Sequence, residues 1–324
     1  MALISNADQK GVDKPSFLCN TVSMKNTHLE HPEDSVLLGK QSVQNVINFL
    51  RDRNSTCTVK WDGAPAIVFG TNPENGKFFV GTKSVFNKVK VKINYTHADI
   101  EKYHGTNPKV AGILHTCLET LPHLEGIYQG DFIGFGGTNT FTPNTITYTF
   151  NSLPDSTSVV LACHTSYEGD TMKTLQASFG VPEYLKHNFM STYFVNTDAT
   201  ITSRRRRVDY ILGLASVVSN FVKYPDAKEV AQLQIAINKC IRENRPVDCI
   251  SGNLLLLFNL ITKAKEMIME GLQSVEQVKA EIVYTGIEVV PGHEGFVMSN
   301  QFGAFKLVKR QKFSFYNFTL PKSW

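Results

Sequence analysis

The chain has 324 residues, of which 42% are hydrophobic and 19% are charged, so it can bury a large core as one elaborated domain or two compact ones. It has no run of about eighteen apolar residues, and its N-terminus lacks the basic and apolar regions of a signal peptide. These features exclude a membrane-spanning or exported protein, and we expect a soluble protein of the cytoplasm. A formal charge of +4 indicates a polyanionic partner only where the cations cluster.

The first part of the chain alternates helical and strand patterns. Apolar residues at helical spacing predict an amphipathic helix over residues 35–50. A β-rich block follows at 56–86, and a proline with Asn-Gly predicts a turn at 71–76 between two of its strands. This arrangement places Lys60 and Lys83 on neighbouring strands of one sheet.

The rest of the chain is predicted from the same two periodicities. Helices are expected at 95–124, 208–222, 227–243 and 254–272, and strands at 126–134, 145–150 and 158–163. The final block, 280–318, is expected to return to strand. Helix formers dominate the region between about 166 and 281. We therefore predict an α+β fold with antiparallel sheets, in which residues 1–165 and 282–324 form one domain and residues 166–281 form a helical insertion.

A short segment before the first predicted helix contains two histidines and three acidic residues. His28 and His31 are three residues apart and invite comparison with a metal site. Because Pro32 disfavours the helical region for the residue before it, His31 is not held on one helical face with His28. A metal role is therefore disfavoured here.

The segment Lys60-Trp61-Asp62-Gly63 ends a β-rich run. A lysine in this position, followed by a carboxylate two residues later and then by a glycine turn, is unusual unless its amine reacts. A solvated lysine at a strand end is the alternative, because four-residue patterns recur by chance. Other segments of the chain decide between the two.

Several later segments carry charged and glycine residues in strand context. They are residues 79–84, 129–132, 144–148, 159–164, 293–297 and 305–309. In order, and together with Lys60–Gly63, they resemble the motifs of the covalent nucleotidyltransferase superfamily, which comprises ATP-dependent DNA and RNA ligases and mRNA capping enzymes. More distantly, the segments around His31, Lys60 and Lys83 resemble ligase-like proteins of large tailed bacteriophages, which implies a host-cell cytoplasm.

The resemblance implies a nucleotidyltransferase fold, that of ligase adenylation domains, and a role for each charged residue. Lys60 attacks the α-phosphate of ATP to form a lysyl-AMP and release pyrophosphate, and nearby cations are expected to lower the pKa of Lys60. Lys306 and Lys309 stabilise the charge on phosphate oxygens. Glu294, with Asp62 of the nucleotide-binding loop, supplies oxygen ligands for Mg²⁺.

The same resemblance completes a nucleotide pocket. Gly63 belongs to its loop, Asp131 and Lys83 lie near the ribose, and either His164 or Phe150 stacks on the base. Structural alternatives stay open for each: Asp131 as a turn residue, His164 as a core histidine, and the two C-terminal lysines as solvated side chains.

Three features depart from the family pattern. Pro65 stands where members often carry arginine, and Asp131 is one methylene shorter than the usual glutamate. No recognisable oligonucleotide-binding domain follows Arg310, whereas DNA ligases and capping enzymes normally have one. An RNA-ligase-like enzyme or a catalytically inactive relative therefore fits the pattern better.

Four adjacent arginines precede a predicted helix, and they are Arg204, Arg205, Arg206 and Arg207. Such a run either neutralises phosphates of a nucleic acid or forms a solvated face, and the sequence leaves both open. The helical insertion around the run is the expected place for substrate specificity or for a protein partner.

We therefore predict an ATP-dependent polynucleotide ligase that uses ATP and Mg²⁺, with RNA favoured over DNA as its substrate. One alternative is a catalytically inactive ligase-fold protein that serves in binding or assembly. Another is a capping-type enzyme that uses GTP. The main hypothesis requires Lys60 to lie close to Glu294, Lys306 and Lys83 in the folded chain.

Overall fold

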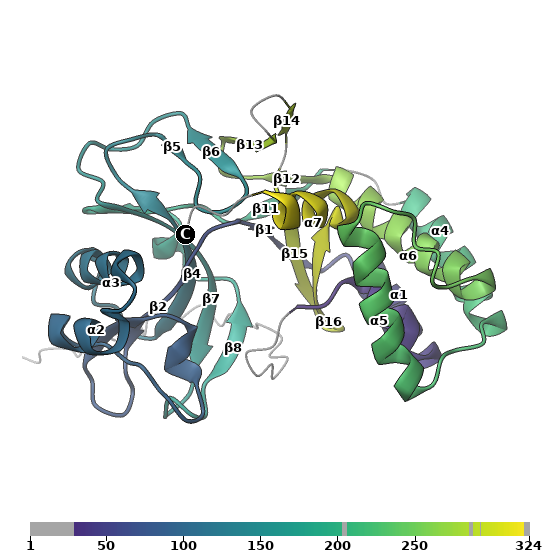
Figure 1. The fold of residues 1–324 in the computed structure, drawn as a ribbon, viewed down its shortest axis with the longest axis horizontal. Helices are drawn as coiled ribbons and strands as arrows, with labels where there is room; N and C mark the ends of the chain where they lie inside the picture. Colours follow the sequence, from purple (N-terminus) through teal and green to yellow (C-terminus); the bar gives the residue numbers. More distant parts are fainter. Residues whose placement is uncertain (1–28, 203–205, 285–287, 292, 321–324) are drawn as a thin grey trace, which may run out of the picture.

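The computed structural model of the protein describes residues 29–202, 206–284, 288–291 and 293–320. The fold is α+β, and its sheets are antiparallel apart from one parallel pair of strands. Figure 1 shows a larger sheet with two helices, a small central sheet, and a group of helices beyond the central sheet. Within the described ranges, no helix is both long and apolar enough to cross a bilayer.

Seven strands form the larger sheet, namely β2 (Ala66–Thr71), β3 (Phe78–Gly81), β4 (Ile127–Phe135), β7 (Val159–Glu168), β8 (Gln176–Phe179), β9 (Asn188–Phe189) and β10 (Thr192–Phe194). They follow the order β3-β2-β4-β7-β10-β9, with β8 also paired to β7. The helices α2 (His97–His104) and α3 (Pro108–Thr120) replace the single helix predicted here. A core that contains Phe69 and Leu114 joins them to the sheet.

The central sheet has three strands in the order β1 (Thr56–Lys60), β15 (Gly295–Asn300) and β16 (Gly303–Val308). An early strand thus pairs with a hairpin from near the end of the chain. The pairing is antiparallel, and Lys60 lies opposite Gly295. This register brings Glu294 next to the end of β1.

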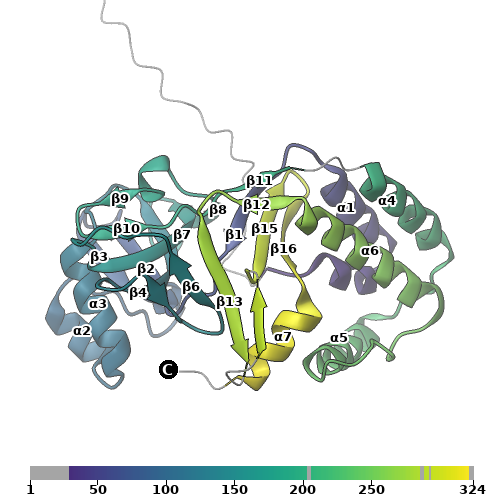
Figure 2. The same ribbon diagram turned by 90° about the horizontal axis from the view of Figure 1, so that it is seen from above.

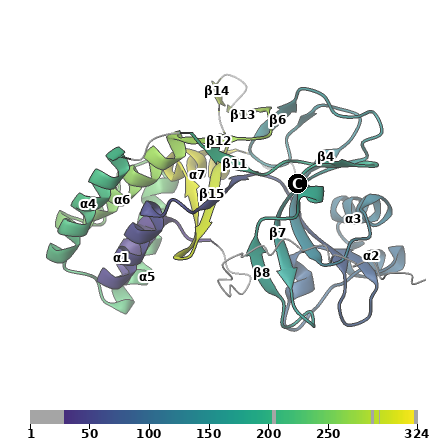
Figure 3. The ribbon, with the colours of Figure 1, turned by 180° about the vertical axis from the view of Figure 1, so that it is seen from behind.

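Helices cover the other side of the central sheet, as Figures 2 and 3 show. They are α1 (Lys40–Arg51), α4 (Arg206–Val218), α5 (Ala227–Arg242) and α6 (Gly252–Glu270), with the 3₁₀ helices η1 (Pro32–Leu38) and η4 (Ser219–Phe221). The last helix, α7 (Arg310–Thr319), directly follows β16 and contacts α5. Two more 3₁₀ helices, η2 (Lys83–Phe86) and η3 (Glu183–Leu185), belong to the larger-sheet side. One core unites the helices with the central sheet and contains Leu50, Leu212, Ile261 and Met298.

Two smaller sheets complete the fold. One consists of β5 (Thr140–Phe141), β6 (Thr147–Phe150), β13 (Val278–Tyr284) and β14 (Glu288–Pro291), and the other of β11 (Ala199–Ile201) and β12 (Leu272–Ser274). Because β11 pairs antiparallel with β12, Ala199 lies opposite Ser274. The helices α4 to α6 therefore leave the fold and return to it at adjacent strands.

Besides the two helices α2 and α3, the structure differs from the sequence prediction in three places. Residues 310–318, which are predicted as strand, belong to the helix α7. The helical insertion is predicted to begin at residue 166, whereas β8, β9 and β10 still belong to the larger sheet. The prediction that Lys60 and Lys83 lie on neighbouring strands is wrong, because β1 belongs to the central sheet and Lys83 opens η2 just after β3. For the short strands of the insertion boundary and for β1, the periodicity of the sequence does not show which strands pair with each other.

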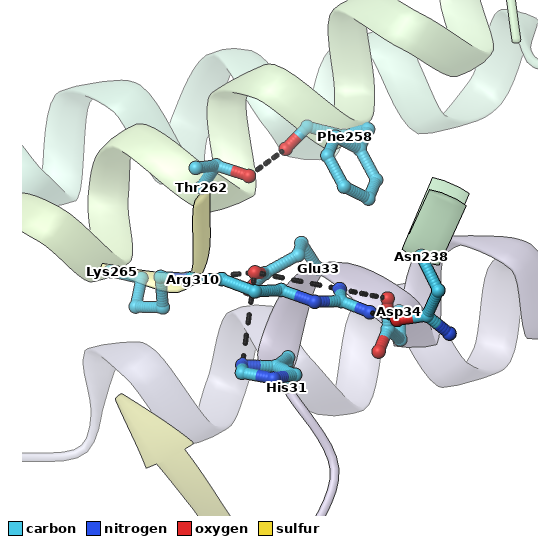
Figure 4. A network of polar contacts seen from close by, with 8 residues as sticks. All are labelled: His31, Glu33, Asp34, Asn238, Phe258, Thr262, Lys265 and Arg310. Atoms are coloured by element: carbon cyan, nitrogen blue, oxygen red, sulfur yellow. Dashed lines mark hydrogen bonds and ion pairs between the residues drawn. The ribbon is translucent and has the colours of Figure 1, made fainter. Parts of the chain in front are cut away.

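Buried charges join the helices to one another (Figure 4). Glu33 and Asp34 of η1 are buried carboxylates. Glu33 Oε1 accepts a hydrogen bond from Lys265 Nζ of α6 at 2.7 Å, and Asp34 Oδ1 accepts one from Arg310 Nη1 of α7 at 2.6 Å. Arg310 Nη2 also donates to Asn238 Oδ1 of α5 at 2.7 Å. The acidic residues after His31 thus form a buried ion network that fixes η1 against three helices.

We expect Lys265→Met to lower the free energy of unfolding by about 3 kcal/mol, because it leaves Glu33 buried without its main partner. The double variant Glu33→Leu with Lys265→Met removes both charges and should recover most of that loss. Urea unfolding of the two variants and the wild type provides the comparison. Equal stability of Lys265→Met and the wild type would contradict a structural role for this pair.

Candidate functional site

A cavity of about 520 Å³ lies between the larger sheet and the central sheet, and small-molecule sites commonly have volumes of about 300–1,000 Å³. Both sheets and η1 supply its charged and polar walls. The lining includes His31, Lys60, Asp62, Gly63, Lys83, Gln129, Asp131, His164, Glu294 and Lys306. Segments that are far apart in the sequence thus meet at one cavity. Lys60 contacts Glu294, and Lys306 and Lys83 line the same cavity.

Lys60 and Glu294 form an ion pair on the cavity wall. Lys60 is the last residue of β1, and Glu294 directly precedes β15, which is the neighbouring strand. The pair depends on Gly295, where φ is +153° and a Cβ atom would lie 2.2 Å from the carbonyl oxygen of Leu307. Only glycine allows β16 to approach so closely. The close approach of β16 therefore explains why glycine follows Glu294 in the sequence.

The ion pair controls the protonation of both groups. Burial favours the neutral amine of Lys60, but the carboxylates of Glu294, Asp131 and Asp62 outweigh it and raise the pKa of Lys60. Burial also raises the pKa of Glu294 to about 7, against the opposing effect of Lys60. The expectation that nearby cations lower the pKa of Lys60 is therefore wrong for the ligand-free chain, because carboxylates surround the amine.

Asp62 holds the loop after Lys60 in place. Its carboxylate accepts hydrogen bonds from Asn144 Nδ2 at 2.8 Å and from the backbone N–H groups of Thr145 and Ile146 at 2.7 and 3.1 Å. Its own backbone N–H donates to the hydroxyl of Tyr148 at 2.7 Å. Asp62 is buried, and these contacts make it a positioning residue for the loop.

Gly63 allows this loop to pack against β4. A Cβ atom at Gly63 would lie 2.7 Å from Asp131 Cβ and 2.7 Å from the carbonyl oxygen of Phe132. The backbone N–H of Ala64 donates to the same carbonyl at 2.9 Å. Glycine is therefore needed for close approach between the lysine loop and the larger sheet.

The larger sheet contributes a second group of polar residues to the cavity. Asp131 Oδ2 lies 3.6 Å from His164 Nε2, and His164 Nδ1 lies 2.7 Å from the hydroxyl of Thr165. Lys83 reaches the same cavity from η2. Phe150, by contrast, is buried against Trp61 at a ring-centroid distance of 6.1 Å, so it is a core residue, and His164 is the one of the two candidates that lines the cavity.

The two C-terminal lysines occupy different places. Side chains alternate between the faces of a strand, so Lys306 and Val308 of β16 both face the cavity, where each is a lining residue. Lys309 follows the strand, is exposed, and lines a separate cavity of about 190 Å³ with His293, Glu294 and Lys312. Lys309 does not line the cavity beside Lys306, where the sequence predicts it, because β16 ends at Val308 and the chain enters α7 at Arg310.

The arginine run lies apart from the cavity. Arg204 and Arg205 fall outside the described residues. Arg206 and Arg207 begin α4 and are exposed, and α4 packs against α1 and α6. Neither arginine lines the cavity that contains Lys60, so any contact they make with a nucleic acid would be separate from it.

A magnesium ion would find few protein ligands at this cavity. In the part of the chain that the structure describes, no group of three or more His, Cys, Asp or Glu side chains is arranged to hold a metal ion. Asp62 already accepts three hydrogen bonds, which leaves Glu294 as the predicted carboxylate ligand. This donor set fits Mg²⁺ that is bound mainly through substrate phosphates and water, as one or two carboxylates commonly suffice for it there.

His31 is a cavity residue that the sequence does not reveal. It is 8% exposed and lies on the wall with Lys60 and Lys306. The proline after it argues against a helical histidine pair, and this argument says nothing about the cavity. A backbone hydrogen bond from Lys306 N to Glu30 O at 3.1 Å brings the segment before η1 to β16. No local pattern predicts such a contact.

We expect Glu294→Gln to lower the pKa of Lys60 relative to the wild type, because burial of the amine remains while its nearest negative charge is removed. Trace acetylation of the folded protein across a pH series, followed by peptide mass spectrometry, measures the reactivity of Lys60. The exposed Lys263 serves as the internal reference. An unchanged reactivity profile for Lys60 would show that Glu294 does not set its protonation.

Comparisons with known proteins complete the description of the site. A family model matches residues 26–251 and 220–322, and the family is described as a family of unknown function (DUF6267). Comparisons with curated proteins and with solved structures gave no match. The family match includes the segments that carry Lys60, Asp131, Glu294 and Lys306. The chain belongs to DUF6267, a family of unknown function.

Proposed function

We propose that this protein is an ATP-dependent polynucleotide ligase with a nucleotidyltransferase fold and a covalent lysyl-AMP intermediate at Lys60. The observation that carries the proposal is the Lys60–Glu294 ion pair in a cavity that Lys306 and Lys83 also line. These residues come from four segments of the chain, and the proposed reaction needs them at one cavity. An inactive ligase-fold protein would share this arrangement, so covalent labelling has to distinguish the two. The volume of the cavity suits a nucleotide.

The first step joins Lys60 to the nucleotide. The neutral Nζ of Lys60 forms a bond to the α-phosphorus, and the bond from that phosphorus to the bridging oxygen breaks and releases pyrophosphate. Glu294 contacts the amine and, with a pKa of about 7, is placed to accept its proton. Because the ion pair favours the charged amine, Lys60 must lose this proton before its Nζ can attack.

Fixed positive charge is needed as the phosphates leave. Lys306 is the cavity-facing lysine of β16 and would stabilise the charge on the phosphate oxygens. Mg²⁺, held by the phosphates and by Glu294 once its proton has passed to solvent, would supply further charge neutralisation when bound. Asp131 and Lys83 would contact the ribose, and His164 would stack on the base, from the larger-sheet side of the cavity.

Two later steps complete ligation. The AMP passes from Lys60 to a 5′-phosphate, and a 3′-hydroxyl then attacks that phosphate and releases AMP. We favour RNA over DNA because residues 144–148 and 159–164 resemble strands of the RNA-ligase branch. In the structure, these segments provide the turn that binds Asp62 and the strand that carries His164, so they contribute to the same cavity.

Covalent labelling tests the proposal directly. Incubation with ATP labelled at the α-phosphate and Mg²⁺, followed by a denaturing gel, should give a labelled protein band. Lys60→Ala should abolish the band because the nucleophile is lost, while Lys263→Ala, a change at an exposed lysine of α6, should keep it. Circular dichroism checks that each variant is folded.

The same assay separates the alternatives. A band with labelled GTP but not ATP would indicate a capping-type enzyme. Absence of a band with either nucleotide, in protein shown to be folded, would overturn the enzymatic proposal and favour an inactive ligase-fold protein.

The two C-terminal lysines provide a test residue, Lys306, and its matched control, Lys309. We expect Lys306→Ala to slow formation of the labelled band by about a hundredfold, as loss of one charge-stabilising donor does in other active sites. Lys309→Ala should leave the rate close to that of the wild type, because Lys309 lies outside the cavity. Rates are measured at saturating ATP. An equal effect of the two changes would contradict the assignment of Lys306.

A further inference from the structure

His31 lies in the cavity with hydrogen-bonding capacity that the fold does not use. Its side chain is 8% exposed, and its Nδ1 is buried without a hydrogen-bond partner among the described residues. Nδ1 lies 4.0 Å from Glu33 Oε1, which is too far for a hydrogen bond, and it faces the buried ion network (Figure 4). A buried polar atom in this state calls for an explanation. Nε2, across the ring, is therefore the nitrogen left for a ligand in the cavity.

The backbone of His31 is held firmly while its ring is not engaged. The carbonyl of His31 accepts a hydrogen bond from the N–H of Asp34 at 3.1 Å. The next two acidic residues bind Lys265 and Arg310 in the buried ion network (Figure 4). Glu33 Oε1 accepts from Lys265, while Glu33 Oε2 and His31 Nδ1 are both left without a hydrogen-bond partner among the described residues. The network thus keeps His31 at the cavity wall without fixing its ring by a hydrogen bond at Nδ1.

The charges around His31 suit an anion. Burial lowers the pKa of His31, and the nearby cations Arg310, Lys306, Lys265 and Lys60 lower it further. The imidazole is therefore neutral in the ligand-free protein, with two of these lysines, Lys60 and Lys306, on the same cavity wall. A neutral imidazole offers one N–H donor to a ligand oxygen, and an anion placed here would meet both the donor and the ammonium groups.

The shape of the cavity indicates which part of a nucleotide meets His31. Asp131 and His164 belong to the larger sheet, and Lys60 belongs to the central sheet. If the sugar and base lie against the larger sheet and the α-phosphate lies at Lys60, the remaining phosphates extend toward β16 and η1. There β16 offers one cation, Lys306, and then the apolar Val308.

We propose that His31 contacts the β- and γ-phosphates of the bound nucleoside triphosphate, and thus the pyrophosphate that leaves. This inference rests on the proposed function, because it assigns a residue to the nucleotide site of Lys60. It adds a phosphate-binding residue on a segment outside the motif strands, and it gives the buried ion network a second role as the support of that residue.

Binding measurements in a chain that cannot react test the inference. In the Lys60→Ala background, with Mg²⁺ present, isothermal titration compares ATP with AMP. Adding His31→Ala should weaken ATP binding by about tenfold, which corresponds to loss of one charge-assisted hydrogen bond, and should leave AMP binding nearly unchanged. His31→Gln keeps a side-chain N–H donor and should recover part of the loss. It also provides the measurement if His31→Ala does not fold.

The outcomes are distinct. If His31→Ala weakens ATP and AMP binding equally, His31 supports the cavity only, and the inference is overturned. If neither ligand is affected, it is overturned as well. If the parent Lys60→Ala protein binds neither ATP nor AMP and the wild type forms no covalent band, the nucleotide site itself is absent and the proposed function fails first. Lys263→Ala, a change at an exposed lysine of α6, is the control and should leave the affinities for both ligands unchanged.

Discussion

The ion pair between Lys60 and Glu294 is the interaction on which the site depends. It joins the end of one strand to the start of its neighbour, and the register of β1 against β15 sets it. Three carboxylates raise the pKa of the lysine, so the free chain holds a charged amine. A reaction at Lys60 therefore requires a change that lowers the pKa of its amine. In the proposed reaction, a metal ion that arrives with the phosphates would have this effect, because a nearby cation favours the neutral amine.

The sequence predicts the local elements and the meeting of the charged residues, but it does not predict how the strands divide between sheets. Lys60 and Lys83 both end β-rich runs, and period-two patterns show which residues alternate, not which strand lies next to which. The pairing of β1 with β15 depends on contacts across most of the chain, including the close approach at Gly295. Motif order captured that long-range contact because it carries information that periodicity lacks.

The type of residue at a motif position predicted its role less well than the place its side chain occupies in the fold. Lys309 matches a basic position in the pattern, yet it lines the smaller cavity with Lys312, because β16 ends at Val308 and Lys309 precedes α7. Asp62 matches an acidic position, and the structure uses it to bind the N–H groups of a neighbouring turn. Phe150 has the aromatic ring expected for stacking, but it packs behind Trp61 in the core. Each difference follows from local geometry that sequence letters do not contain.

The buried ion network gives the helices a connection to the cavity. Glu33 and Asp34 follow His31 directly and bind residues of α6 and α7, while the backbone before His31 pairs with β16. Buried charges are costly to separate, so the segment between these two attachments has little freedom to move alone. A displacement of α6 or α7 would be transmitted to the wall that contains His31 and Lys306. The helical layer is therefore part of the structure that shapes the cavity, and a partner bound to these helices would have a physical route to the site.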